Sequence, residues 1–241
     1  MQTLQQTNMN IPKLRKAIFE AVAAKKILKT GYVRQPGGLY PAECDTVAAH
    51  SHTISVLSVL LASEIAEDLK KACGVELNLQ DVAVLAIFHD YGEAKSGDTG
   101  AQSIAMYNVC KLHNLERDGL KSTVIDWKMA DAIMKLYDDY RKYSTPEALA
   151  VHIADNLEGF EKALENFHNK PWVLENALRI FQENIQIYRR RKMFGEQLGN
   201  VSDFLVEQVL IPGMQALADT FRIGVDMREL AEKAVMTSPQ E

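Results

Sequence analysis

The sequence predicts an all-α protein that forms a single domain over residues 1–241. Apolar residues recur at three- and four-residue spacing, and no segment alternates apolar and polar residues as a half-buried strand does. The chain contains 13 Gly and 7 Pro among 241 residues, which favours long uninterrupted helices over many short strands. With 47% hydrophobic and 24% charged residues, the composition is typical of a soluble globular protein.

The first half of the chain is expected to contain several long helices. Pro12 stands in the first turn of a helix over residues 12–29, a position where proline is favoured. The following "TGYVRQPGGLYPAEC" reads as a loop, because it contains three glycines and two prolines. The apolar periodicity then predicts four further helices, over residues 46–73, 79–95, 100–118 and 122–143.

The second half continues the helical pattern. In "STPEA", Ser144 or Thr145 is the expected N-cap of a helix that starts at Pro146 and runs to about Phe167. A helix after Pro171 ends in "YRRRK", a basic cluster that we interpret as complementing the helix dipole rather than as a phosphate site. Two more helices are expected, over residues 202–221 with a break at Pro212 and over residues 226–235.

Charge and composition exclude several classes of protein. A net charge of −5 argues against a general nucleic-acid binder. Cys44, Cys73 and Cys110 are too few and too scattered for a disulfide framework or a zinc knuckle, so each is expected to be a free thiol. No basic-then-apolar signal opens the sequence, and no apolar run approaches the ~18 residues of a membrane span. We therefore expect a cytoplasmic protein without a membrane partner.

Several residues could form a metal site. His50 and His52 lie at the start of one predicted helix, and His89 and Asp90 lie side by side near the end of the next. Asp155 lies in mid-helix among apolar residues, where an unpaired carboxylate would be costly. Imidazoles and carboxylates together suit Mn, Co, Fe or Zn, with Mg less favoured. A single histidine on an apolar helix face is, however, also compatible with a hydrogen-bonded core residue.

Three segments resemble a known family. "LKTGYVRQPGGLYPAECDTVAAHS", "IFHDYGEAKSGD" and "YDDYRKYSTPEALAVHIADNLEGF" are similar to motifs of the HD-domain metal-dependent phosphohydrolases, closest to the YfbR-type 5′-deoxynucleotidase branch. The resemblance covers roughly residues 28–165. It implies an HD-domain helical bundle at about residues 28–168, followed by additional C-terminal helices at about residues 171–236.

The resemblance also implies roles for individual residues. Four residues correspond to the ligands of one divalent metal ion (Mn, Co, Fe, Zn or Mg): His50, His89, Asp90 and Asp155. Glu93 and Asp98 correspond to the two catalytic acids, and Glu93 also lies four residues after His89, on the same face of the predicted helix. Arg34 corresponds to a loop arginine that contacts the nucleotide, with Tyr32 beside it. His52 has no counterpart among the family's ligands.

These roles predict an enzyme that hydrolyses (deoxy)nucleoside 5′-monophosphates by attack of a metal-bound water. Departures from the family motifs at Ala49, Tyr32 and "TGAQSIAMYN" leave the substrate open. One alternative is a dinuclear phosphodiesterase or a diiron oxygenase that also uses His113 and His152. Another is a non-catalytic, metal-stabilised helical interaction protein. The expected partner is a small nucleotide, and the apolar C-terminal helices leave a homodimer open.

Overall fold

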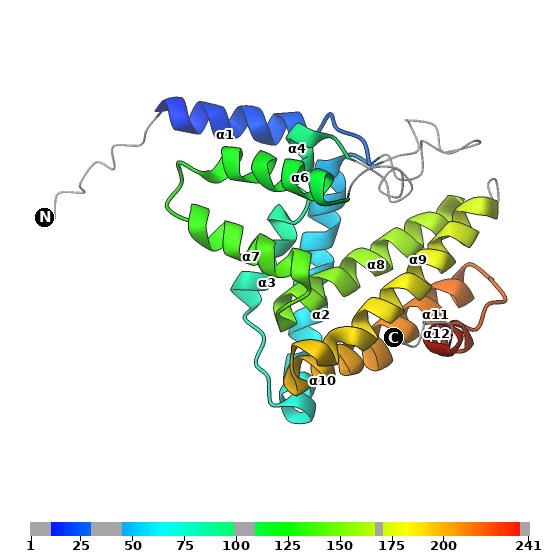
Figure 1. The fold of residues 1–241 in the computed structure, drawn as a ribbon. Helices are drawn as coiled ribbons and strands as arrows, with labels where there is room; N and C mark the ends of the chain where they lie inside the picture. Colours follow the sequence, from blue (N-terminus) through cyan, green and yellow to red (C-terminus); the bar gives the residue numbers. More distant parts are fainter. Residues whose placement is uncertain (1–10, 30–44, 99–108, 167–170, 237–241) are drawn as a thin grey trace, which may run out of the picture.

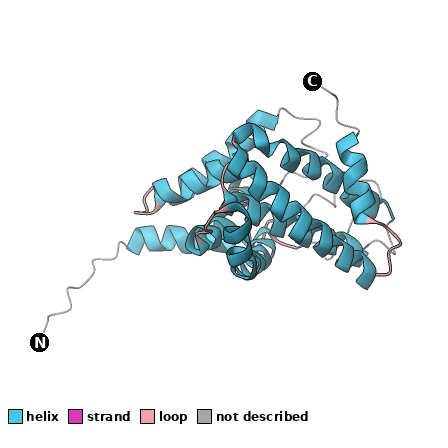
Figure 2. Cartoon of the chain, turned by 90° about the horizontal axis from the view of Figure 1, so that it is seen from below, coloured by secondary structure: helices cyan, strands magenta, loops and turns pink. Residues whose placement is uncertain are grey.

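The structure, a computed structural model, describes residues 11–29, 45–98, 109–166 and 171–236, which form helices joined by short loops (Figures 1 and 2). Within these ranges β-type pairing is limited to one isolated antiparallel bridge, between Leu28 and Thr46. The prediction of an all-α fold is confirmed. None of the helices in these ranges combines the length and apolar character that a membrane span requires.

Helix α2 (Val47–Cys73) runs through the middle of the molecule, as Figure 1 shows. Both of its ends follow from local sequence. The Thr46 side chain accepts a hydrogen bond from the backbone N–H of Ala49, and Gly74 ends the helix in the left-handed conformation with φ 67°. The predicted helix over residues 46–73 is therefore confirmed.

Helix α1 (Ile11–Ala24) is shorter than the predicted helix over residues 12–29. The backbone N–H of Val47 donates to the Ile27 carbonyl, and the N–H of Lys29 donates to the Asp45 carbonyl. These bonds tie residues 27–29 to the start of α2 in an extended conformation. Long-range pairing thus overrides the helical propensity of "KKILK", and it places Lys29 beside α2.

The predicted helix over residues 79–95 is broken in two. Helix α3 (Leu79–Phe88) ends before His89, and α4 (Glu93–Ser96) begins after a turn of four residues. Gly92 packs directly against the backbone of α6 (Val109–Val124), because a Cβ atom on Gly92 would lie 2.1 Å from the Glu116 carbonyl oxygen. The chain therefore bends at the His-Asp pair, and the sequence prediction of one continuous helix is wrong.

The next boundary also differs from the prediction. Helix α6 continues to Val124, whereas α7 (Ala130–Lys142) begins eight residues later than the predicted start at 122. Trp127 lies in the turn between them and is 38% exposed, so the predicted apolar face does not run through it as one continuous helix. Part of the predicted helix over residues 100–118 lies outside the described residues.

Helix α8 (Pro146–Asn166) is capped by Thr145, whose hydroxyl accepts from the backbone N–H of Ala148. Ser144, the other predicted cap, instead bonds back to Asp139. Helix α8 then packs against α2 and α3 on one side and against α9 (Pro171–Arg189) on another. It therefore contacts helices from both the N-terminal and the C-terminal parts of the chain (Figure 1).

The C-terminal helices form a layer against α8. They are the 3-10 turn η2 (Arg190–Phe194), α10 (Glu196–Leu205), the π-helical turn η3 (Val206–Leu210), α11 (Ile211–Thr220) and α12 (Met227–Met236). The helix predicted over residues 202–221 begins earlier, at Glu196. The break expected at Pro212 is absorbed by η3, and Pro212 itself stands in the first turn of α11, where its missing N–H costs little.

The basic cluster "YRRRK" forms ion pairs between the helices of this layer. Arg189 pairs with Asp203 and Glu207. Arg191 donates to the carbonyl of Ile187 in α9. This contact agrees with the prediction that the cluster complements the end of its own helix, but it concerns Arg191 and not Arg189. The ion pairs of Arg189 are made with α10 and η3 rather than with helix carbonyls, so the cluster holds neighbouring helices together.

The buried residues fall into separate cores. The largest joins α8 to α9–α12 and includes Phe160, Phe181, Leu205 and Met214. A second core lies between α2, α3, α7 and α8 and includes Ile54, Leu85, Tyr140 and Val151. Since the apolar faces of the C-terminal helices are buried within this chain, the homodimer inferred from them stays a prediction. The second core borders the cluster of residues described next.

Candidate metal centre

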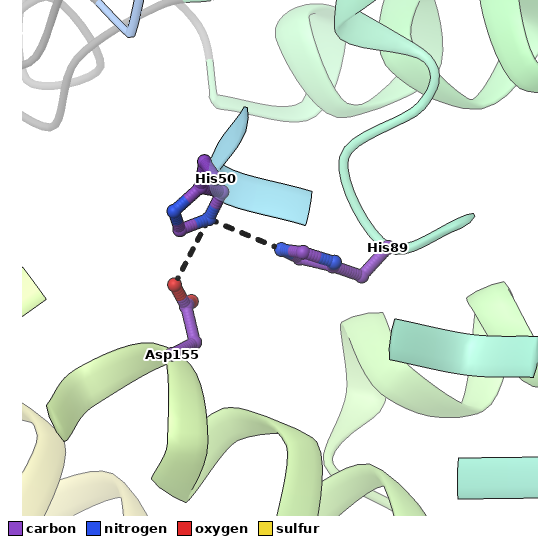
Figure 3. Close-up of side chains that lie close together, drawn as sticks. All are labelled: His50, His89 and Asp155. Carbon is purple, nitrogen blue, oxygen red and sulfur yellow. Dashed lines mark hydrogen bonds and ion pairs between the residues drawn. The ribbon is translucent and has the colours of Figure 1, made fainter. Parts of the chain in front are cut away.

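Three side chains, two on helices and one at the end of a third helix, converge on one point (Figure 3). His50 lies in the first turns of α2, His89 follows α3, and Asp155 lies on α8; the two histidines are 6% and 2% exposed. One ligand atom from each lies within 4.8 Å of the others. The Nε2 atoms of the histidines are 3.3 Å apart, and His50 Nε2 is 3.3 Å from Asp155 Oδ1.

These separations suit a divalent ion. Nitrogen and oxygen ligands at ~2.0–2.2 Å from one ion lie ~3 Å or slightly more from each other. Two imidazoles and a carboxylate also form a donor set that borderline transition metals prefer. The described side chains therefore fit a resident metal ion at this point, although they do not identify the metal.

Asp90, the fourth predicted ligand, also lies at this centre. Its Oδ2 is 3.3 Å from Nε2 of both His50 and His89. The same oxygen lies 2.6 Å from Lys29 Nζ. The structure thus brings all four predicted ligands together, with Asp90 shared between the histidines and Lys29, whose side chain is partly buried.

The outer nitrogens of the two histidines are held by further hydrogen bonds. His50 Nδ1 donates to Glu158 Oε2 at 3.2 Å, and His89 Nδ1 donates to the Ala86 carbonyl at 2.8 Å. Each bond leaves the Nε2 atom directed at the centre, which is how proteins orient metal-binding imidazoles. Asp155 Oδ2 in turn accepts from the Tyr140 hydroxyl at 3.3 Å. Glu158 was not predicted, yet its position one helical turn after Asp155 is a usable signal.

Lys29 links the metal centre to both predicted catalytic acids. Its ammonium lies 3.0 Å from Glu93 Oε2 and 3.5 Å from Asp98 Oδ1, in addition to its contact with Asp90. Glu93 and Asp98 are each 7% exposed. Lys29 was not predicted as a site residue, although "HDYGEAKSGD" carries three acids whose burial calls for a cation. It lies in the first of the three segments that carry the family resemblance.

The two carboxyl groups nearest the lysine have opposite proton affinities. Burial raises the pKa of Glu93, and the negative charge of Asp90 raises it further, so it lies well above its usual range despite Lys29. Burial also acts to raise the pKa of Asp90. His89 and Lys29 outweigh burial and hold the pKa of Asp90 well below its usual range. Asp90 therefore stays an anion suited to a cation, while Glu93 is the group able to take up a proton.

The protonation of His50 shows how strongly this centre attracts positive charge. Burial lowers the pKa of His50, but hydrogen bonds with Asp155, Asp90 and Glu158 raise it to about 12. Burial raises the pKa of Asp155, yet its bond with His50 brings that pKa down to about 2. A divalent ion bound at Nε2 would take the place of this imidazolium proton, so metal binding here is coupled to proton release.

Three other histidines of the described residues, His52, His113 and His152, do not belong to this group of ligand atoms. His152 is buried between the rings of Tyr140 and Tyr143, with both ring centroids 3.7 Å away, and its Nε2 donates to the Tyr140 carbonyl at 2.8 Å. His113 lies half-buried on α6, and His52 is exposed on α2. Among the described residues, the group able to hold a metal consists of His50, His89 and Asp155, so the dinuclear alternative gains no support from His113 or His152.

The loop residues predicted to bind substrate, Arg34 and Tyr32, lie outside the described residues. The described chain leads toward that loop from two sides, at Lys29 and at Asp45. Their roles stay predictions.

The burial of His152 has a measurable effect on stability. Burial lowers the pKa of His152 to about 3, whereas the unfolded value is about 6.5. The unfolded chain therefore binds the proton more readily, so the stabilisation is complete above pH ~6.5 and is lost as the pH falls toward 3, by on the order of 4–5 kcal/mol. We expect His152→Gln to flatten the fall in the free energy of unfolding between pH 7 and 4, measured by urea denaturation.

His52→Gln is the matched control for this measurement, because it makes the same substitution at an exposed position of α2. Parallel pH profiles for wild type and His152→Gln would show that His152 titrates alike in the folded and unfolded chains.

Residues 25–190, more than half of the chain, match the HD domain family, and the protein therefore belongs to that family. A search of the curated proteins finds no match to it.

Solved structures of similar fold come from both archaea and bacteria. A conserved hypothetical protein from Pyrococcus furiosus is 23% identical with a TM-score of 0.51, over 71% of this chain and 99% of that one. A Pyrococcus horikoshii protein is 22% identical with a TM-score of 0.55, over 78% and 98%. An HD-domain phosphohydrolase from Listeria innocua is 18% identical with a TM-score of 0.57, over 93% and 99%. At these identities the likeness is one of fold.

Proposed function

We propose that this HD-domain protein is a metal-dependent phosphohydrolase that releases phosphate from (deoxy)nucleoside 5′-monophosphates. The observation that carries the proposal is the meeting of His50, His89 and Asp155 beside two buried acids, Glu93 and Asp98, held by one lysine. Such a pairing of metal ligands with proton-transfer groups is the requirement for metal-assisted hydrolysis. The Listeria innocua protein of similar fold, named as an HD-domain phosphohydrolase, supports the same class of activity.

In this proposal, each side chain of the centre has a distinct role in the reaction. A divalent ion in this site would polarise the phosphoryl group and make a water molecule easier to deprotonate. Glu93, with its raised pKa, accepts the proton of the attacking water and can return it to the leaving oxygen. Lys29 fixes Glu93 relative to Asp90 through contacts of 3.0 and 2.6 Å. Asp98, within 3.5 Å of the same ammonium, is positioned to relay the proton.

The nucleotide specificity rests on the family resemblance rather than on described contacts. Arg34 is proposed to bind the phosphate, and Tyr32 to stack on the sugar or base. The sequence contains no glycine pattern that would cradle a triphosphate. We therefore propose a preference for monophosphates over di- and triphosphates.

A phosphate-release screen tests this function. The chelator-treated protein is supplied in turn with Mn, Co, Mg or Zn and assayed on mono-, di- and triphosphate nucleotides. We expect monophosphates to be cleaved fastest, and only with metal. Absence of phosphate release from every nucleotide with every metal would overturn the proposal. Faster cleavage of triphosphates would overturn the monophosphate preference while leaving the phosphohydrolase class in place.

A further inference from the structure

An anionic substrate meets an acidic environment at this centre. Five carboxyl groups belong to it or adjoin it: Asp90, Glu93, Asp98, Asp155 and Glu158. Lys29 is already in contact with three of them, so its ammonium has little capacity left for a phosphate. A phosphate dianion approaching a centre of this kind needs a cation with unused N–H donors besides the metal.

Arg141 on α7 is a cation of that kind. It follows Tyr140, whose hydroxyl contacts Asp155, and its side chain is 28% exposed. Within the described part of the chain, its ion-pair partner is Glu116, through a single contact of 3.4 Å between Nη1 and Oε2. That separation is longer than a normal charge-assisted hydrogen bond, so most of the guanidinium donors are available to another acceptor.

Arg117, on the neighbouring helix α6, makes a bidentate ion pair and so provides a comparison for Arg141. Its Nε and Nη2 atoms donate to the two oxygens of Asp138 at 2.7 and 2.8 Å. This is the bidentate geometry that holds a guanidinium in place. Arg141 lacks such an arrangement, and the difference sets the two arginines apart as a test pair.

The contacts of Glu116 place Arg141 beside the metal centre. The Glu116 backbone packs on Gly92, in the turn between Asp90 and Glu93, so α6 lies directly on the segment that carries the His-Asp pair. Burial raises the pKa of the Glu116 carboxyl. The charge of Arg141 acts to lower this pKa, and the charges of Asp90 and Asp98 act to raise it. Burial raises the pKa of Tyr140, whose hydroxyl contacts Asp155, and the charge of Arg141 acts to lower that pKa. Arg141 and Glu116 thus border the centre rather than a remote surface.

We propose that Arg141 is a substrate-binding residue: its guanidinium binds phosphate oxygens of the substrate, and Glu116 is the resident carboxylate that the incoming phosphate displaces from it. The planar fork of an arginine matches two phosphate oxygens, and a single long ion pair is readily exchanged for two shorter ones. The inference rests on the proposed phosphohydrolase function, but it concerns phosphate binding and can be tested without turnover.

Three matched variants of the metal-loaded full chain separate this role from a structural one: Arg141→Gln, Glu116→Gln and Arg117→Gln. Arg141→Gln should raise KM for the best monophosphate about ten- to a hundredfold, the value of lost hydrogen bonds to a charged group. Glu116→Gln should not raise KM, because it frees Arg141. Arg117→Gln should leave KM as in wild type. Equal KM increases for Arg141→Gln and Glu116→Gln, with equal losses of Tm, would mean that the pair is structural and would overturn the inference.

Binding of inorganic phosphate, measured by titration calorimetry on the metal-loaded protein, gives the readout that does not depend on turnover. Arg141→Gln should weaken phosphate binding by a similar factor, Arg141→Lys by less, and Glu116→Gln should not weaken it. If wild type hydrolyses no nucleotide yet binds phosphate through Arg141, the proposed function fails and this inference stands. If wild type is active and Arg141→Gln binds phosphate equally well, or if wild type binds no phosphate, this inference fails.

Discussion

Replacing His89 by alanine should reduce the metal content of the protein from one divalent ion per chain to nearly none, and turnover should fall with it. His89 contributes one of the three convergent ligand atoms. Its Nε2 lies 3.3 Å from His50 Nε2 and 3.3 Å from Asp90 Oδ2. Because His89 is itself one of the ligand residues, the loss of affinity should exceed the ten- to a hundredfold expected for replacing an outer partner of a ligand. Elemental analysis after dialysis measures the content directly.

The matched control is His52→Ala, which removes the same side chain from the exposed face of α2 two residues after His50. It should retain the full metal content. A full complement of metal in His89→Ala would refute the site as described. Two ions per chain in wild type, one of them lost in His113→Ala, would instead favour the dinuclear alternative.

Glu93→Gln should lower kcat by two to four orders of magnitude while metal content stays near normal. The amide keeps the shape of the side chain and one acceptor for Lys29, but it cannot take up a proton. The expected loss is the usual value of a positioned general acid or base. The contrast with His89→Ala is the informative part, because one variant removes the ion and the other leaves it in place.

Asp98→Asn completes this comparison, because Asp98 contacts the same ammonium. Steady-state rates on the best monophosphate, with metal content measured on the same samples, distinguish the two acids. If Glu93→Gln turns over at the wild-type rate and Asp98→Asn does not, then Asp98 carries the proton and Glu93 serves only to hold Lys29.

Local sequence signals predicted those parts of the fold that local interactions determine. The ends of α2 at Thr46 and Gly74 are set by a side-chain cap and a left-handed glycine, both legible from the sequence. The break after α3 is different, because it depends on the packing of Gly92 against a helix more than 15 residues later in the chain. No local periodicity carries that information.

The same division holds for the site. His50, His89, Asp90 and Asp155 could be singled out because their residue types and order match a known pattern. Lys29 could not, because the sequence around it favours a helix and its place beside α2 comes from pairing between Leu28 and Thr46. The role proposed for Arg141 was likewise not predictable from the sequence, because it depends on the comparison between the ion pairs of Arg141 and Arg117 in the structure.

Helix α8 joins events at the metal centre to the stability of the whole chain. Asp155 and Glu158 face His50, while Asn156, between them, hydrogen-bonds to Tyr188 and Asn184 of α9. Any ligand that binds the folded helix more tightly than the unfolded one must stabilise every element that folds together with it. Metal binding is thus thermodynamically linked to the C-terminal layer, and a substitution that loosens α9 lowers metal affinity without touching a ligand. The C-terminal layer therefore helps to determine how much metal the protein binds at a given concentration of free metal ion.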